Sequence, residues 1–282
     1  MQIFHQKEAL IQFLKKEKIE NKTIGLVPTM GALHQGHLSL VEKALNDNNT
    51  VVVSIFVNPT QFDNKTDLEK YPKTWEKDLE NLKKVSDNIL IFAPSAEDIY
   101  DNKVASETFD FDGLENEMEG KFRSGHFDGV GTIVKKLFTI VQPDRAYFGE
   151  KDFQQLQIIR KMVEKHNLPL TIIGCPISRE DNGLAMSSRN ERLPSDLREK
   201  ASFIFKTIQK AKEKFGTESA IDTVNWIEEQ FRQQPFFKLE YAEIANEKTL
   251  KPVKTKKENE HYRLFVAVYA NDIRLIDNVA LN

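Results

Sequence analysis

Residues 24–38 read IGLVPTMGALHQGHL, and this stretch decides the fold class. It begins with a short, continuous apolar run at 24–27, which is typical of a buried strand. The segment 28–37, which contains two histidines, then leads into residues 38–45, whose apolar positions recur at helical spacing. A strand followed by a helix in this way is the repeating unit of a parallel α/β sheet.

The chain has 282 residues, enough for one large domain or two modest ones. Hydrophobic residues make up 40% and charged residues 29%, as in globular proteins with a packed core. The 40 basic and 43 acidic residues are interspersed and leave a net charge of −3. A broad basic face for a nucleic-acid backbone is therefore not expected, and no polynucleotide partner is predicted.

No segment has the pattern of a membrane span or an export signal. The longest apolar runs, such as VVVSIFV at 51–57, are much shorter than a membrane span. The first residues, MQIFHQKEALIQFLKK, carry charges where a signal peptide has its apolar centre. The single cysteine, Cys175, cannot form an internal disulfide and is expected to be a small buried side chain. We therefore expect a soluble, cytoplasmic chain with no membrane partner.

Apolar runs and helical segments alternate through the first 175 residues. Continuous apolar runs indicate buried parallel strands, which we expect at 23–27, 51–57, 88–92, 146–148 and 170–174. Helical spacing is found at 37–45, 74–85, 129–141 and 152–166. The alternation predicts a Rossmann-like, doubly wound parallel sheet with helices on both faces, which we assign to a ligand-binding domain at residues 1–175.

The pattern changes after Cys175. Two helices, at about 195–215 and 217–233, precede expected strands at 239–245, 264–270 and 273–275. We predict a smaller α+β domain over 176–282 that closes as a lid. The lysine-rich stretch at 248–261 is expected to be a solvated hairpin loop.

Four polar segments directly follow expected strands. They are PTMGALHQGH at 28–37, NPTQF at 58–62, FGEKD at 148–152 and PISRE at 176–180. In open α/β sheets, ligands bind at the carboxyl ends of the strands. We therefore expect these segments to contribute to one ligand site.

The two histidines of the first segment suit a phosphate site. If His37 opens the helix, His34 lies about one turn before it, and Gly36 between them lets a ligand approach the backbone. The helix N-terminus is expected to add unpaired N–H groups and a positive dipole. Imidazole donors there would stabilise charge on an α-phosphate as pyrophosphate leaves. The alternative is structural, with one histidine capping the helix and the other packing.

Two other nucleotide-binding motifs are incomplete in this sequence. Residues 129–131 read GVG and lack the third glycine of a dinucleotide fingerprint, and Gly120-Lys121 lacks the other elements of a P-loop. The later segment GLAMSSRN at 183–190 offers two hydroxyls and an arginine. We expect its two serines and Arg189 to form a second clamp on the phosphates.

These motifs resemble those of the nucleotidyltransferase superfamily and, within it, the pantoate–β-alanine ligases. The resemblance lies in PTMGALHQGH, SIFVNPTQF, GHFDGVGTIV, YFGEKDFQQLQIIRKMV and GLAMSSRN, which follow in this order between Thr23 and Asn190. It implies an ATP-dependent condensation of (R)-pantoate with β-alanine through a pantoyl-adenylate, with release of AMP and pyrophosphate. It also implies a Mg²⁺ requirement and a homodimer.

The resemblance assigns roles to individual residues. It makes His37 the proton donor and places His34, Lys151 and Arg189 with it as the catalytic set. The implied ATP site comprises Met30, Gly31, Ala32, Leu33, His34, Gln35, Gly36, His37, Gly149, Glu150, Lys151, Asp152, Ser178, Met186, Ser187, Ser188 and Arg189.

Two glutamines are assigned to the other substrates. The resemblance implies that Gln61 contacts pantoate and β-alanine and that Gln155 holds pantoate. Neutral amides can bind hydroxyls and a carboxylate without adding a charge that would quench the carboxylate's attack.

Some residues depart from the family's pattern. Ser178 stands where the family usually has valine, 181–183 read DNG in place of a commoner x-Asp-Gly, and Ser124 replaces a frequent proline. The first two changes concern the adenine side of the ATP site. Asp78 lies where the family can offer a carboxylate to Mg²⁺, but Lys77 beside it has the wrong charge. No protein ligand for the metal is therefore assigned, and the ATP phosphates are expected to hold most of its shell.

Two other functions share part of this pattern. A nucleotidylyltransferase would use the same histidines but keep AMP on its product. A non-catalytic ATP sensor could retain the fold, but it need not retain the whole catalytic set. Because the sequence keeps that set, the ligase is favoured.

Overall fold

The computed structural model describes residues 1–62, 68–69, 71–101 and 103–282. The chain divides into two compact units, Met1–Pro176 and Ile177–Asn282, each with its own sheet. Within the described residues, no helix is both long enough and apolar enough to cross a membrane.

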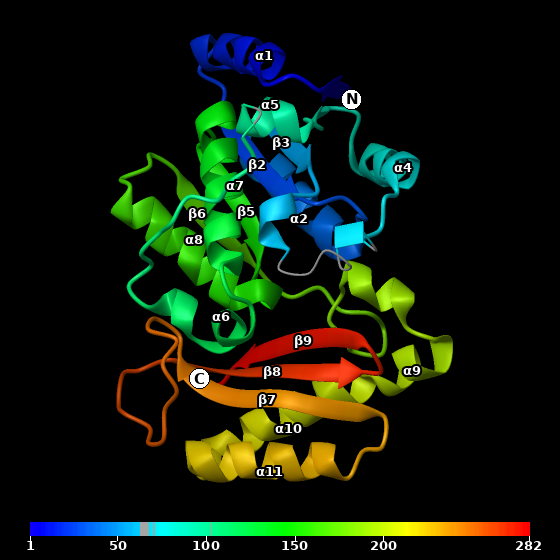
Figure 1. Cartoon of the computed structure of the whole chain (residues 1–282), viewed down its shortest axis with the longest axis vertical. Helices are drawn as coiled ribbons and strands as arrows, with labels where there is room; N and C mark the ends of the chain where they lie inside the picture. The colour runs from blue at the N-terminus through cyan, green and yellow to red at the C-terminus, as the bar shows by residue number, and fades with distance from the viewer. Residues whose placement is uncertain (63–67, 70, 102) are drawn as a thin grey trace. The chain divides into compact units, whose positions relative to one another are not determined.

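Unit 1 is built on a sheet of six parallel strands (Figure 1), as the alternating pattern predicted. In spatial order the sheet reads β1-β4-β3-β2-β5-β6. The strands are β1 (Gln2–Phe4), β2 (Ile24–Thr29), β3 (Thr50–Ile55), β4 (Ile89–Phe92), β5 (Arg145–Gly149) and β6 (Thr171–Cys175).

Helices cover both faces of this sheet. Figure 1 shows α7 and α8 on one side of it and α2 and α4 on the other. The helices are α1 (Lys7–Ile19), α2 (Gln35–Asp47), α4 (Trp75–Val85), α5 (Ala96–Tyr100), α6 (Met118–Phe122), α7 (His126–Val141) and α8 (Phe153–Lys165). Short 3-10 segments are η1 (Pro59–Gln61), η2 (Leu114–Asn116) and η3 (Glu150–Asp152).

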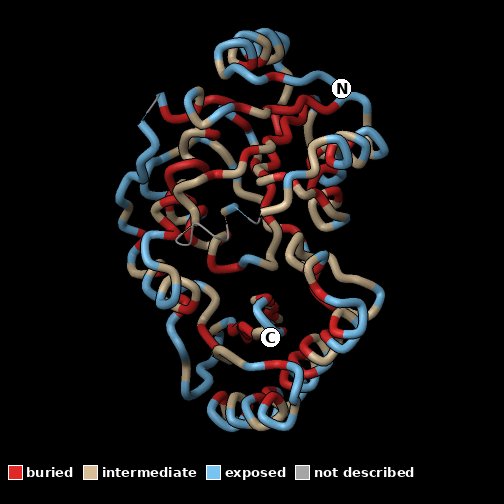
Figure 2. The backbone as a smooth tube through the Cα atoms, turned by 45° about the vertical axis from the view of Figure 1, so that its right-hand side comes forward, coloured by how far each residue is buried: buried red, intermediate tan, exposed pale blue. Residues whose placement is uncertain are grey.

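Burial on both faces of the sheet explains the run of three valines in the central strand β3. Val51 and Val53 pack in one core cluster with Val41 of α2 and Leu82 of α4. Val52 points to the opposite face, because side chains alternate along a strand, and it is buried as well. Figure 2 accordingly shows a buried backbone through the middle of this unit.

The strand order of the sheet reverses between the neighbouring strands β2 and β5. From β2 it proceeds to β3 and β4 on one side, and it later returns to β5 and β6 on the other. Thr29 is paired with Ile55, and Gly25 with Arg145, so the carboxyl ends of β3, β2 and β5 are neighbours. The loops after these strands therefore emerge at one edge, where open α/β sheets bind ligands.

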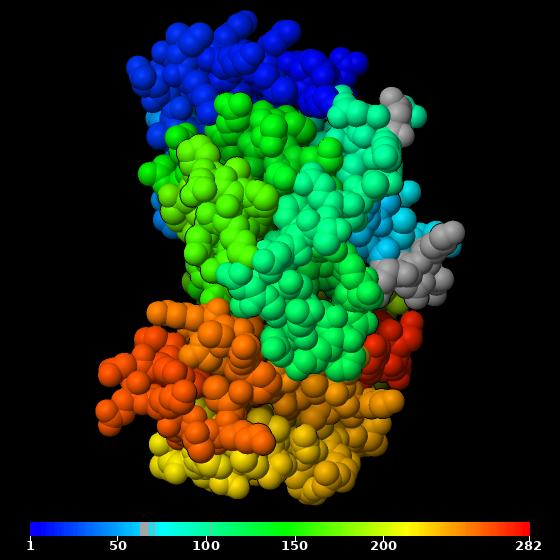
Figure 3. Space-filling view, turned by 60° about the vertical axis from the view of Figure 1, so that its left-hand side comes forward, coloured from blue at the N-terminus to red at the C-terminus, as the bar shows by residue number. Residues whose placement is uncertain are grey.

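Unit 2 is a smaller α+β unit. Its antiparallel sheet has the order β7-β8-β9, formed by β7 (Phe237–Asn246), β8 (Tyr262–Ala270) and β9 (Ile273–Ala280). Helices α10 (Ser202–Thr217) and α11 (Ala220–Arg232) share one hydrophobic cluster with these strands. The lysine-rich stretch at 248–261 connects β7 to β8, as predicted, and lies within the orange surface segment in Figure 3.

Several elements differ from the sequence prediction, which did not include helices α1, α5 and α6. Strand β1 was not predicted, because three residues at a sheet edge are too few to show a hydrophobic period. The single helix expected at 195–215 is divided into α9 (Ser195–Lys200) and α10. Ala201 between them has φ −64° and ψ −12°, closer to a 3-10 turn than to an α-helix, and this interrupts the helix.

The close approach of α7 to η1 depends on Gly129. A Cβ at this position would lie 2.0 Å from the carbonyl oxygen of Thr60. Gly129→Ala should therefore lower the free energy of unfolding by about 1–3 kcal/mol, as measured by urea denaturation. Gly216→Ala in α10 is the control, because a Cβ there would meet nothing within 4 Å. Equal losses in the two variants would contradict this account.

Candidate active site

The two histidines cap helix α2 reciprocally. His34 has extended backbone angles at the N-cap, and its Nδ1 accepts the Gly36 N–H at 3.1 Å. The Nδ1 of His37 accepts the His34 N–H at 3.4 Å. The centroids of the two rings are 4.1 Å apart, so the spacing of the motif does bring the imidazoles together.

The capping bonds determine the tautomer of each ring. A ring nitrogen that accepts a hydrogen bond carries no proton, so the proton of each neutral imidazole lies on Nε2. Each histidine therefore caps the helix with one nitrogen and can donate to a ligand with the other. The structural and the phosphate-binding interpretations of the motif are compatible.

The expectation of unpaired N–H groups at this helix start does not hold for His34, Gly36 and His37. The N–H groups of His34 and Gly36 bond to the imidazoles, and that of His37 bonds to the His34 carbonyl at 2.8 Å. Donors for a ligand at this position are thus the Nε2–H groups together with the helix dipole.

Electrostatics keep His37 neutral. Burial, followed by the charges on His34 and Lys151, lowers the pKa of His37 from 6.5 to about 3. The effect of Lys151 means that its ammonium acts at the histidine pair, although the two segments are far apart in the sequence. Of the four residues predicted to be catalytic, His34 and His37 are therefore in contact in unit 1, and the charge of Lys151 reaches His37.

Lys151 lies in η3, directly after the carboxyl end of β5. Its side chain is only 18% exposed, with Nζ 3.6 Å from a carboxylate oxygen of Asp152. Lys151 is therefore not a solvated surface lysine. Glu150 and Gly149, also predicted for the ATP site, belong to the same turn.

A buried carboxylate holds the loop between β2 and α2. Gly31 and Ala32 have left-handed φ angles of +79° and +51°, and the N–H groups of Ala32 and Leu33 donate to Asp78 at 3.0 and 2.7 Å. The hydroxyl of Thr74 donates to the same carboxylate at 3.1 Å. Convergent backbone N–H groups of this kind bind anions, and here the anion is a side chain of the protein.

Asp78 therefore does not fit the role of a metal ligand. It is 1% exposed, and both of its oxygens accept bonds from the loop. Its position four residues before the buried Leu82 places it on the apolar face of α4, a signal that could have revealed this structural role. Among the described residues, no group of three or more His, Cys, Asp or Glu side chains could hold a metal ion.

The backbone of Gln61 is held by two residues to which the sequence analysis gave no role. His126 Nδ1 donates to the Gln61 carbonyl at 3.0 Å, and Arg123 Nη1 donates to His126 Nε2 at 3.1 Å. Burial, followed by the charge of Arg123, lowers the pKa of His126 to about 4. This histidine thus has the opposite tautomer to His34 and His37. His126 lies in the family motif GHFDGVGTIV, whose residues received no individual assignment, and Arg123 precedes this motif by two residues.

Adjacent glutamines in α8 have different environments. Gln154 is buried, and its amide donates to the carbonyls of Leu114 and Glu117, each at 2.8 Å, so it ties α8 to η2. Gln155 is only partly buried. The structure therefore gives Gln154 a packing role and leaves Gln155, the residue predicted to hold pantoate, on a more accessible part of the helix.

The remaining predicted ATP residues lie together in unit 2. The N–H of Met186 donates to the carbonyl of Ser178 at 3.0 Å. This bond joins Ser178 to the predicted segment 186–189. The Ser187 hydroxyl accepts the Arg189 N–H at 3.3 Å and caps the 3-10 segment η4 (Ser188–Arg192).

The sequence DNG at 181–183, which departs from the family's usual pattern, has a structural explanation. Asn182 donates through its amide to the carbonyl of Arg198 at 3.1 Å and accepts the Leu184 N–H at 3.0 Å. Gly183 has a φ of +93°, which favours glycine. The side chain of Asn182 therefore stabilises a turn within unit 2.

Comparison with known families gives a match over almost the whole chain. The model of the family described as pantoate-beta-alanine ligase matches residues 2–280. The chain belongs to the pantoate–β-alanine ligase family. It is accordingly a ligase of pantothenate biosynthesis.

Curated relatives agree with this family. The chain is 59% identical to the pantothenate synthetase of Christiangramia forsetii over 282 residues and 57% identical to that of Flavobacterium psychrophilum over 281 residues. Each alignment covers 100% of both chains.

Solved structures of the family share the fold. The pantothenate synthetase of Thermus thermophilus has a TM-score of 0.90 and 38% identity, with 100% of this chain and 99% of that chain covered. A pantoate-beta-alanine ligase from Francisella tularensis, complexed with beta-gamma ATP and beta-alanine, has a TM-score of 0.77 and 35% identity, with coverage of 100% and 98%.

The lowered pKa of His37 can be tested by NMR. Long-range ¹⁵N–¹H spectra should show His37 as the neutral Nε2–H tautomer, with shifts that stay constant between about pH 5 and pH 8. The urea-unfolded protein is the control, because its histidines should titrate near about 6.5. Below that pH the unfolded chain binds a proton that native His37 does not, so the stability of the fold should fall toward pH 3. A native midpoint between pH 6 and 7 would overturn this assignment.

Proposed function

We propose that this ligase forms pantothenate in two steps. A carboxylate oxygen of (R)-pantoate attacks the α-phosphate of ATP, which gives pantoyl-adenylate and pyrophosphate. The amine of β-alanine then attacks the acyl carbon, which gives pantothenate and AMP. The observation that carries the proposal is the histidine pair at the start of α2, with two Nε2 donors and with His37 within reach of the charge of Lys151.

His37 acts as a neutral hydrogen-bond donor. An imidazole with a pKa of about 3 is not protonated near pH 7, so His37 supplies a fixed N–H dipole to the phosphates, while Lys151 supplies the positive charge. The proton-donor role implied by the family resemblance thus becomes a hydrogen-bonding role. Charge that develops on departing pyrophosphate is stabilised without reorganisation of the site.

The other substrates are assigned to the glutamines. Gln61 contacts pantoate and β-alanine, and Gln155 holds pantoate. Support comes from the fixed backbone of Gln61 and from the accessible position of Gln155 next to the buried Gln154. Preorganised amides orient the carboxylate for in-line attack.

The two units are assigned different parts of the reaction. Residues 1–175 bind pantoate and most of ATP through 30–37 and 149–152. Residues 176–282 act as a lid, with Ser178 and Met186 to Arg189 over the nucleotide. Closure protects the acyl-adenylate from water.

Further proposals concern the metal, the assembly and the compartment. Mg²⁺ enters with ATP as part of the substrate, and the phosphates supply most of its ligands, because Asp78 is committed to the loop. The enzyme acts as a homodimer, as the resemblance implies. We place the reaction in the cytoplasm, where ATP is available.

Isotope labelling distinguishes the proposed chemistry from its alternatives. With ¹⁸O in the carboxylate of pantoate, one labelled oxygen becomes the bridge of the acyl-adenylate and leaves with the nucleotide. Mass spectrometry should therefore find the label in AMP. Label in inorganic phosphate would indicate an acyl-phosphate route, and the absence of free AMP would indicate a nucleotidylyltransferase. Either result would contradict the proposal.

His37→Asn separates capping from catalysis. The asparagine oxygen can accept the His34 N–H in place of Nδ1, but the asparagine amide N–H groups lie nearer the backbone and do not reach the position of Nε2–H. The urea midpoint should stay close to that of the wild type, while kcat falls by about 10²–10³, as when a preorganised donor is removed. The comparison is His37→Ala, which should lose both stability and activity. Near-normal turnover of a folded His37→Asn variant would remove His37 from the mechanism.

A further inference from the structure

The predicted phosphate loop of unit 2, Met186 to Arg189, lies between two anchored ends. On one side, Arg179 and Ala185 form an antiparallel bridge, and the Glu180 N–H donates to the Leu184 carbonyl at 2.8 Å. On the other side, the Asn190 N–H donates to the Ser187 carbonyl at 2.9 Å. The loop is thus a short closed segment.

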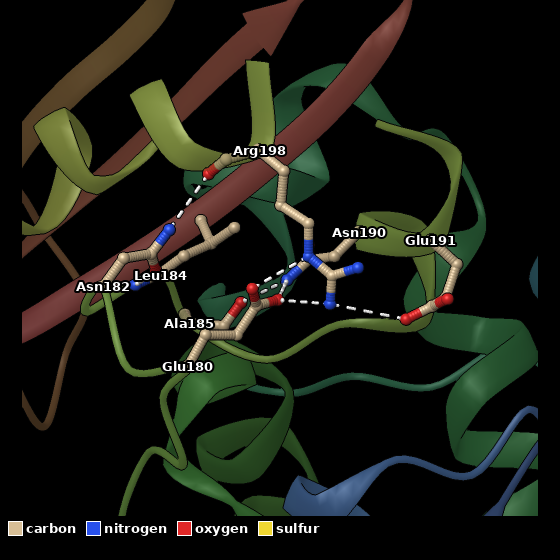
Figure 4. Close-up of polar contacts among 7 residues, drawn as sticks. All are labelled: Glu180, Asn182, Leu184, Ala185, Asn190, Glu191 and Arg198. Carbon is tan, nitrogen blue, oxygen red and sulfur yellow. Dashed lines mark hydrogen bonds and ion pairs between the residues drawn. The ribbon is translucent and has the colours of Figure 1, made fainter. Parts of the chain in front are cut away.

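The side chain of Asn190 links the two ends. It is 1% exposed, and its Nδ2 donates to the Ala185 carbonyl at 3.0 Å and to Glu180 Oε1 at 2.7 Å. Figure 4 shows Asn190 and Arg198 converging on the Glu180 carboxylate. The Oδ1 of Asn190 is buried and has no partner among the described residues, which costs stability. The amide of Asn190 therefore stabilises the loop through the two bonds that its Nδ2 donates.

Arg198 of α9 fixes the Glu180 carboxylate. Its Nε donates to Oε2 at 2.8 Å and its Nη2 to Oε1 at 3.0 Å, a two-point pairing that sets the orientation of the carboxylate. The pairing with Glu180 raises the pKa of Arg198. Both side chains are mostly shielded from solvent, so salt screens this pair less than a surface pair.

We infer that Glu180 is a positioning residue for nucleotide binding. Its carboxylate, oriented by Arg198, holds Asn190 and thereby keeps the Met186-to-Arg189 loop in its binding conformation before ATP arrives. A loop that is already ordered loses less conformational entropy when it binds phosphate. This inference rests on the proposed role of the loop in ATP binding, and it gives a role to three residues that had no individual assignment: Glu180, Asn190 and Arg198.

Steady-state kinetics of the full chain test the inference. In Glu180→Gln, an amide nitrogen replaces one carboxylate oxygen and faces N–H donors, so the loop loses an anchor. The KM for ATP should rise by about tenfold, while the KM for pantoate changes less than about twofold. Asn190→Asp should have the same effect, because it sets two carboxylates against each other while the Glu180–Arg198 pair remains. It also keeps the test available if Glu180→Gln does not fold.

The matched control is Glu191→Gln. Glu191 contacts the same arginine at 3.4 Å, but its side chain is 64% exposed, and both KM values should stay at the wild-type level. Arg189→Ala is the benchmark for the loop. If it raises the KM for ATP while Glu180→Gln and Asn190→Asp do not, the positioning role is wrong and the proposed ATP loop stands. If Arg189→Ala leaves the KM unchanged, both are wrong. A fall in kcat alone in the Glu180 and Asn190 variants would also overturn the inference, because it indicates only a loss of folded enzyme.

Discussion

The hydrogen bonds that the two imidazoles accept at the start of α2 are the constraint on which the proposed site depends. They hold His34 and His37 side by side, and they place the proton of each ring on Nε2. A helix start is electropositive, and the burial of His37 makes protonation unfavourable there. One local arrangement thus caps the start of the helix and leaves the Nε2–H of a neutral His37 as a donor for the proposed phosphate site.

The loops that carry the predicted site residues are held in a common way. A polar side chain from another segment bonds to the loop backbone or to its anchors: Asp78 holds 31–33, His126 holds Gln61, and Asn190 on Glu180 holds the loop at 186–189. These side chains are mostly shielded from solvent, where a fixed hydrogen bond is strong and a missing one is costly. Site side chains are thereby fixed by residues that need not contact any substrate.

The tautomers illustrate how context determines the chemistry of one residue type. His34 and His37 accept through Nδ1 because backbone N–H groups face them, whereas His126 donates through Nδ1 because a carbonyl faces it. The pKa values of His37 and His126 are both lowered, to about 3 and about 4, in each case mainly by burial. Neither of these two rings is then expected to titrate near neutral pH, so the donors keep their hydrogen-bonding roles there.

Local periodicity in the sequence determined the parallel strands other than β1, the helices α2, α4, α7, α8 and α11 and the position of the histidine motif at a helix start, because neighbouring residues share these patterns. It could not show the order β1-β4-β3-β2-β5-β6, the break at Ala201 or the use of Asp78 by the loop. Strand order depends on contacts between distant segments. The bonds from Ala32 to Asp78 and from His126 to Gln61 join residues 46 and 65 positions apart, and no local pattern records such pairs. Only the tertiary structure decided which polar residues support the site, because hydrogen-bond partners are set by distance in space.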